Sequence, residues 1–171
     1  MLFHVCRFTF HEKSIPMLKR TTIIETILVL NIILFLYTGI SKIMEYDEFY
    51  EQLADSPFLG FAATPIALFL PWVEFAVVLM LIVPRWRLKG FYATLTLMVL
   101  FTAYIIGLFS IDKELPCSCG GIIALLSWKQ HLVFNSVFIL LNVLAIRLQK
   151  RKKKEQEKAW NEASTYLASH T

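Results

Sequence analysis

Four long apolar segments constrain the fold of this chain more than any other feature. They cover about residues 22–43, 64–83, 90–111 and 130–146. Roughly 20 helical residues are needed to cross about 30 Å of hydrocarbon, and 57% of the chain is hydrophobic. Helices satisfy their own backbone hydrogen bonds in lipid, whereas the short alternating segments of a membrane barrel do not occur in this sequence. We therefore predict an all-α, polytopic four-helix bundle that spans a membrane.

Basic residues are concentrated on one side of the predicted bundle. The side that holds both termini and the loop between the second and third segments carries 14 of the 17 lysines and arginines. They are Arg7, Lys13, Lys19, Arg20, Arg85, Arg87, Lys89, Arg147, Lys150, Arg151, Lys152, Lys153, Lys154 and Lys158. The positive-inside rule makes this side cytoplasmic, so both termini are predicted to be cytoplasmic.

This pattern divides the chain into three parts. Residues 1–20 form a cytoplasmic N-terminal segment, residues 21–148 form the membrane domain, and residues 149–171 form a basic cytoplasmic tail. The bilayer is the expected partner of the membrane domain. The tail attracts anionic headgroups as any basic cluster beside a membrane does, and nothing else in the sequence indicates nucleic-acid binding.

The first outer loop contains a helical pattern. Tyr46, Phe49, Tyr50 and Leu53 recur at helical spacing within residues 44–54, and acidic residues occupy the other face. This pattern predicts a short interfacial helix with tyrosines at headgroup level. An anchor that caps the bundle is favoured over a surface for docking a partner.

The second outer loop carries two cysteines, in Cys117-Ser118-Cys119-Gly120-Gly121. The predicted topology places this loop outside the cytoplasm, where disulfides form and persist, whereas Cys6 belongs to the opposite side. A disulfide across one intervening residue closes a small, strained ring, which favours exchange over structural stapling. The apolar residues 122–126 are too few to span, and they predict a short helix or a re-entrant turn.

The cysteine pair could also serve in two roles without disulfide exchange. The thiolates could belong to a metal site, for which a soft metal such as Cu(I) would need further ligands. The pair could also be structural or incidental. Zinc is disfavoured because it takes four ligands and the usual second Cys/His pair is missing.

Glu74 lies inside the second apolar segment, in Pro71-Trp72-Val73-Glu74. A carboxyl at this depth is costly unless it is neutral or paired, and it usually has a function. Proton exchange is the favoured role. A hydrogen bond to His131 or to a tyrosine, made only for helix packing, is the alternative. For Lys42, at the end of the first segment, snorkelling outward is favoured over a contact with Glu74 or a role in favouring a nearby thiolate.

The fourth segment has a polar face. His131 and Asn135 are four residues apart, so they share one side of a helix, which Trp128 and Asn142 extend. A polar face on an apolar helix is expected to point into the bundle. His131 is predicted to relay protons or to bind a quinone carbonyl, and a satisfied helix contact is an equal alternative.

These motifs together resemble a known family. Tyr-Thr-Gly-Ile-Ser-Lys at 37–42, Pro-Trp-Val-Glu at 71–74 and Cys-Ser-Cys-Gly-Gly at 117–121 are similar to the DoxX-like superfamily, and to its MauE-type redox-associated membrane proteins. The resemblance covers roughly residues 20–148. It implies a thiol–disulfide role in maturing disulfide-rich periplasmic proteins. It also implies a location in the bacterial inner membrane, with a separate thioredoxin-like protein as partner.

The sequence therefore predicts a membrane thiol–disulfide redox protein acting on the extracytoplasmic face. Cys117, Cys119, Glu74 and His131 are the predicted catalytic residues. A membrane quinone is the candidate cofactor, and its predicted contacts are Trp72, Trp128 and Asn135. No bound metal is expected. The alternative is a non-enzymatic assembly factor or accessory subunit of an envelope or respiratory complex.

Overall fold

The structure of the chain is a computed structural model, which describes residues 3–111 and 128–169. Its elements are α1 (Phe3–Met44), α2 (Tyr46–Ala54), the 3-10 turn η1 (Gly60–Ala62), α3 (Ala63–Ile82), α4 (Arg87–Ile111) and α5 (Trp128–Ala168). The described part of the chain contains no strand. The predicted all-α class is confirmed, and the short helix predicted in the first outer loop is α2.

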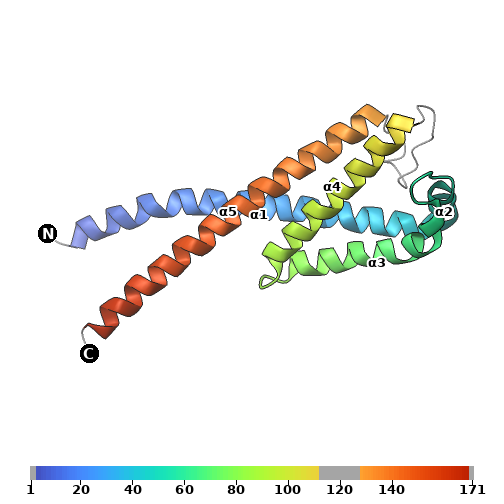
Figure 1. The fold of residues 1–171 in the computed structure, drawn as a ribbon. Helices are drawn as coiled ribbons and strands as arrows, with labels where there is room; N and C mark the ends of the chain where they lie inside the picture. The colour runs from blue at the N-terminus through green and yellow to red at the C-terminus, as the bar shows by residue number, and fades with distance from the viewer. Residues whose placement is uncertain (1–2, 112–127, 170–171) are drawn as a thin grey trace.

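Four helices are long and apolar enough to cross a membrane. Their candidate spans are Lys19–Met44, Gly60–Ile82, Arg87–Leu108 and Lys129–Ala168. Helix α1 packs against α3 and α5, and α4 packs against the same two helices (Figure 1). The result is a bundle whose outward face is itself apolar, with exposed Ile33, Phe69 and Leu140. An apolar exterior suits lipid rather than water.

Both terminal helices continue past the bundle. Helix α1 begins at Phe3 and α5 ends at Ala168, whereas the expected membrane segments begin near residue 22 and end near residue 146. The sequence of α5 contains neither glycine nor proline, and its tail is rich in strong helix formers such as Lys, Glu, Gln and Ala. Arg20 of α1 donates to Glu155 of α5 at 2.8 Å where these extensions leave the bundle.

Buried side chains fill the interior of the bundle in the half nearer the α3–α4 turn. Its core contains buried side chains from all four long helices, among them Ile27, Leu81, Phe91 and Ala145. At Gly90 the first turn of α4 approaches α3 so closely that an added Cβ would lie 3.0 Å from the Leu81 backbone nitrogen. Glycine is therefore needed for this close approach.

Two buried asparagines link α1 to α5 in the middle of the bundle. Asn142 donates from Nδ2 to Asn31 Oδ1 at 3.0 Å, and both residues are 0% exposed. Polar side chains often form such hydrogen bonds between membrane helices. Asn142 belongs to the polar face predicted on α5, so part of that face is engaged in helix packing.

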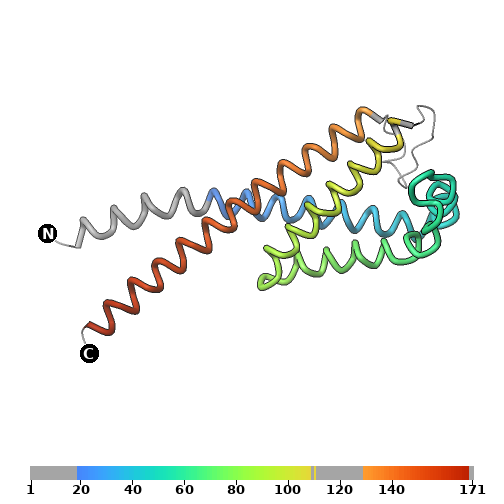
Figure 2. The backbone as a smooth tube through the Cα atoms, viewed as in Figure 1, coloured from blue at the N-terminus to red at the C-terminus, as the bar shows by residue number. Residues whose placement is uncertain are grey.

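The opposite end of the bundle is capped by α2. Its buried Phe49 and Leu53 pack on Ala63 and Ala67 of α3, while the rings of Tyr46 and Tyr50 stack on its outer side. The end of α4 and the start of α5 reach this same end (Figure 2). The segment with Cys117 and Cys119, and the short helix or turn predicted after it, lie outside the described residues.

We expect the Asn31 and Asn142 side chains to be energetically coupled. Asn31→Ala, Asn142→Ala and the double variant form a double-mutant cycle, which unfolding in mixed micelles would measure. The coupling should be about 0.5–1.5 kcal/mol, because either single change already breaks the hydrogen bond between the two side chains. Asn31→Ala combined with Thr102→Ala is the control, since the Thr102 hydroxyl bonds the Met98 carbonyl of its own helix. Strictly additive effects of the two asparagine changes would contradict the coupling.

Candidate functional site

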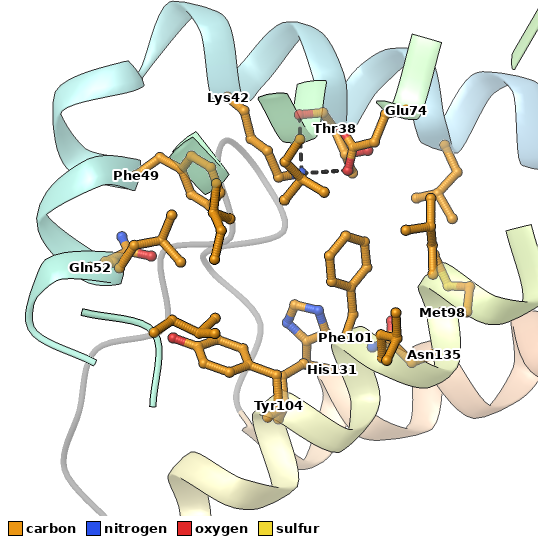
Figure 3. Close-up of a pocket in the computed structure, with 18 of the residues that line it drawn as sticks. Thr38, Lys42, Phe49, Gln52, Glu74, Met98, Phe101, Tyr104, His131 and Asn135 are labelled. Carbon is orange, nitrogen blue, oxygen red and sulfur yellow. Dashed lines mark hydrogen bonds and ion pairs between the residues drawn. The ribbon is translucent and has the colours of Figure 1, made fainter. Parts of the chain in front are cut away.

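A cavity of about 380 Å³ lies beneath α2, in the capped half of the bundle. Its walls come from α1, α2, α3, α4 and α5, and most of the lining side chains are apolar (Figure 3). The apolar lining consists of Leu34, Phe49, Leu53, Leu59, Ile66, Leu70, Leu97, Met98, Leu100, Phe101, Ile105 and Phe134. The polar lining consists of Thr38, Lys42, Gln52, Glu74, Tyr104, His131 and Asn135. A small number of polar groups in an apolar pocket is the usual composition of a small-molecule site.

A buried ion pair occupies one wall of the cavity. Lys42 Nζ lies 2.8 Å from Glu74 Oε1, and their side chains are 7% and 0% exposed. The ammonium also approaches the Thr38 carbonyl at 3.4 Å. Lys42 stands one turn beyond Thr38 on α1, so its side chain can reach back to that carbonyl while it pairs with Glu74 of α3.

Close packing of α1 on α3 holds the carboxylate in place. A Cβ added at Gly39 would lie 2.9 Å from the Phe75 ring and 3.3 Å from Glu74 Oε2. A side chain at position 39 would therefore force the Phe75 ring and the Glu74 carboxylate to move. Glu74 Oε2 is buried and has no hydrogen-bond partner among the described residues.

Two aromatic rings flank the ammonium group. Lys42 Nζ lies 5.7 Å from the centroid of Phe49, on α2, and 5.7 Å from the centroid of Phe101, on α4. Ring faces attract a cation at this range, more strongly when water is excluded. The ammonium is therefore held by a carboxylate and two rings that come from three different helices.

The opposite wall carries His131 and Asn135 of α5 (Figure 3). They are 6% and 3% exposed, and both line the cavity. In the part of the chain that the structure describes, His131 Nδ1 is buried without a hydrogen-bond partner. A buried polar atom without a partner is uncommon in a folded protein and calls for a ligand, a water or a further protein group.

The structure brings three predicted site residues into one cavity, namely Glu74, His131 and Asn135. The expectation that Lys42 snorkels outward is wrong, because an ion pair and two rings hold its ammonium inside the bundle. The residue that pairs with Glu74 is thus Lys42, and not His131 or a tyrosine.

Trp72 lies outside the cavity. Its side chain is 63% exposed, and its ring meets Phe75 edge-on at 6.1 Å between centroids. Two residues correspond to about 200° around a helix, so Trp72 points away when Glu74 points inward. Trp128 is the first residue of α5, but its side chain is not among those that the structure describes. Cys117 and Cys119 also lie outside the described residues.

Two of the cavity residues that the sequence did not indicate are informative. Phe101 flanks Lys42 from α4, and Gln52 reaches the cavity from α2. Phe101 is one of 14 phenylalanines, and nothing in its local sequence distinguishes it. Gln52 carried a usable signal, because it is three residues after Phe49 on a helix predicted to cover the bundle.

Among the side chains that the structure describes, no three from His, Cys, Asp or Glu come together as a possible metal site. The cavity has two such residues, Glu74 and His131, and the Lys42 ammonium already pairs with the carboxylate. Its donor set therefore suits an organic ligand better than a metal ion.

Comparison with known proteins places the chain in a family. The model of the family described as "Methylamine utilisation protein MauE" matches residues 20–148. The chain belongs to the MauE family. No curated protein and no solved structure matches significantly. The match contains α2, α3 and α4 whole, and every residue that lines the cavity. The chain is therefore a membrane protein whose cavity lies inside the region that defines the MauE family.

Breaking the Lys42–Glu74 pair should destabilise the protein strongly. We expect Lys42→Met or Glu74→Gln to lower the free energy of unfolding by about 3–5 kcal/mol, because each change leaves one buried partner unsatisfied. The double variant Lys42→Met/Glu74→Leu should regain most of this loss, because it removes both groups. Denaturant unfolding in mixed micelles would measure these effects.

The exposed pair Arg20–Glu155 has the same 2.8 Å separation and provides the matched control. Arg20→Met should cost less than about 1 kcal/mol, because water and salt screen an exposed pair. Equal losses from Lys42→Met and Arg20→Met would show that burial of the Lys42–Glu74 pair is energetically unimportant.

Proposed function

We propose that this MauE-family protein exchanges disulfides at the extracytoplasmic face of a bacterial inner membrane, through Cys117 and Cys119. The observation that carries the proposal is the cavity, which places Glu74 and His131 at one end of the bundle. The cysteine segment connects Ile111 of α4 to Trp128 of α5. Both helix ends lie at the capped end of the bundle (Figure 2). Groups able to carry protons are therefore near the attachment points of the thiol segment.

The distribution of charge supports an outward position for the cysteines. The N-terminal part of α1, the α3–α4 turn and the C-terminal part of α5 carry most of the basic residues, and they lie away from α2 (Figure 1). The exposed outer side of α2 carries acidic residues, including Asp47 and Glu48. The positive-inside rule then assigns the α2 end to the oxidising compartment.

The proposed reaction is a two-electron thiol–disulfide exchange. The Cys117 and Cys119 thiols reduce a disulfide of a periplasmic thioredoxin-like partner or client, and they become a disulfide themselves. Two electrons and two protons pass to the partner, whose two sulfurs become thiols. In the reverse direction the Cys117–Cys119 disulfide oxidises the partner. Glu74 and His131 are the groups that would accept and release protons on the membrane side.

An accessory role is the second candidate, and the family's name favours it. A membrane protein of a family named for methylamine utilisation could act as an assembly factor or accessory subunit without redox chemistry. The cysteines would then make a contact or be incidental. This candidate predicts little loss of function when either cysteine becomes serine, and it predicts a stable partner that copurifies.

Thiol labelling in intact cells tests the proposed exchange. In a Cys6→Ser background, a membrane-impermeant maleimide should label Cys117 and Cys119 only after mild reduction. Before reduction, the exchange mechanism expects the pair to be a disulfide on the outer face. Cys117→Ser and Cys119→Ser should each expose one thiol that reacts without reductant. Either change alone should abolish complete disulfide exchange with the partner protein, because a full cycle of exchange needs both sulfurs.

The variant Cys117→Ser/Cys119→Ser, with Cys6 retained, is the topology control and should remain unlabelled until the cells are permeabilised. An unlabelled pair under all conditions would overturn the outward placement. Full activity of either single serine variant would overturn the exchange mechanism in favour of the accessory role.

A further inference from the structure

We infer that the cavity beneath α2 binds the head group of a membrane quinone between Lys42 on one wall and His131 on the other. The redox role of this quinone rests on the proposed function, the thiol–disulfide exchange. The binding itself rests on the cavity alone. The assignment rests on the shape, the charge and the hydrogen-bonding capacity of the described lining.

The lining calls for a lipophilic, uncharged ligand. Twelve of the lining residues are apolar, and most of the lining comes from the candidate membrane-spanning helices. The two charged groups form an ion pair at 2.8 Å, so together they present no net charge. A charged ligand would add an uncompensated charge to this wall, which is expensive inside a membrane.

Lys42 provides a hydrogen-bond donor to such a ligand. An ammonium group has three N–H bonds. Among the described residues its acceptors are Glu74 Oε1 and, at the longer distance of 3.4 Å, the Thr38 carbonyl. The ammonium lines the cavity between Phe49 and Phe101, so its third N–H is available to an acceptor that enters beside these rings. The two rings also offer surfaces for stacking on a planar ligand.

His131 provides the second polar contact, from the facing wall. Its side chain is almost fully buried, and Nδ1 has no partner in the part of the chain that the structure describes. Asn135, one turn along α5, adds an amide to the same wall. The cavity therefore presents polar groups on two opposite sides, separated by apolar side chains, as Figure 3 shows.

A quinone ring fits this arrangement better than the other occupants of a membrane cavity. It is uncharged, planar and apolar on its faces, and it carries carbonyl acceptors on opposite edges. A lipid tail would leave the Lys42 donor and His131 Nδ1 without partners. Water would satisfy those groups, but it would be placed against the many leucine and phenylalanine side chains of the lining.

The redox step balances with the proposed thiol chemistry. Oxidation of the Cys117 and Cys119 thiols to a disulfide releases two electrons and two protons, and reduction of a quinone to a quinol consumes both. Glu74 and His131 stand beside the positions assigned to the carbonyl oxygens, where protons are needed. Reversal of the same step would reduce the disulfide with a quinol.

Calorimetric titration with decylubiquinone tests the binding. Its fully substituted ring does not add to thiols, and detergent micelles without protein serve as the blank. The full-length chain and its Cys117→Ser/Cys119→Ser variant should bind equally. His131→Leu should weaken binding about tenfold, as should Lys42→Met/Glu74→Leu, because each removes one hydrogen bond to the ligand. Met98→Trp should abolish binding by filling the cavity that Met98 lines.

The control is Thr94→Val, a change at a fully buried hydroxyl that does not line the cavity. It should leave the affinity unchanged. Heat no greater than that of empty micelles would overturn the quinone proposal, and so would equal binding by wild type, His131→Leu and Met98→Trp. His131→Leu decides the question if Met98→Trp does not fold. Failure of binding with successful thiol labelling would remove the quinone and leave the exchange with a protein partner intact.

Discussion

The rest of the capped half of the bundle depends on the buried Lys42–Glu74 ion pair. Both groups are inside candidate membrane spans, where an unpaired charge costs several kcal/mol. The pair fixes the register of α1 against α3, because sliding either helix by one residue would rotate one partner out of reach. Gly39 lies beside this contact, where a Cβ would meet the Phe75 ring at 2.9 Å and Glu74 Oε2 at 3.3 Å. The cavity lies beside this contact between α1 and α3.

The ion pair also explains why α2 lies where it does. Lys42 is near the end of α1, and Phe49 of α2 folds back over its ammonium, with Phe101 of α4 at the same distance. Phe49 and Leu53 are buried against α3 at the same time. A helix that looks from its sequence like an interfacial anchor is therefore also the roof of the cavity. Its tyrosines and acidic residues remain outside, where the sequence pattern placed them.

Elementary rules predicted the membrane class and the approximate limits of the spans. They also predicted the inward direction of His131 and Asn135, because a polar side chain in an apolar segment has few favourable places. They favoured snorkelling over pairing for Lys42 and were wrong, since the outcome depends on how α1 is rotated against α3. The contact between Asn31 and Asn142 joins residues 111 positions apart, and only packing brings them together. The exposure of Trp72 was accessible from the sequence, because a residue two positions before an inward Glu74 points away from it.

The two halves of the bundle are built differently, and this difference limits what the protein can do. Near the α3–α4 turn, side chains such as Ile27, Leu81 and Phe91 fill the interior, and the buried asparagine pair links α1 to α5. Near α2 the interior is hollow and carries an ion pair and a histidine. A cavity confined to one half, with a packed core beneath it, suits chemistry or binding at one face of the membrane rather than passage of a solute across it. A thiol pair attached at the hollow end would make use of that asymmetry, because electrons and protons could then be exchanged without opening the packed half.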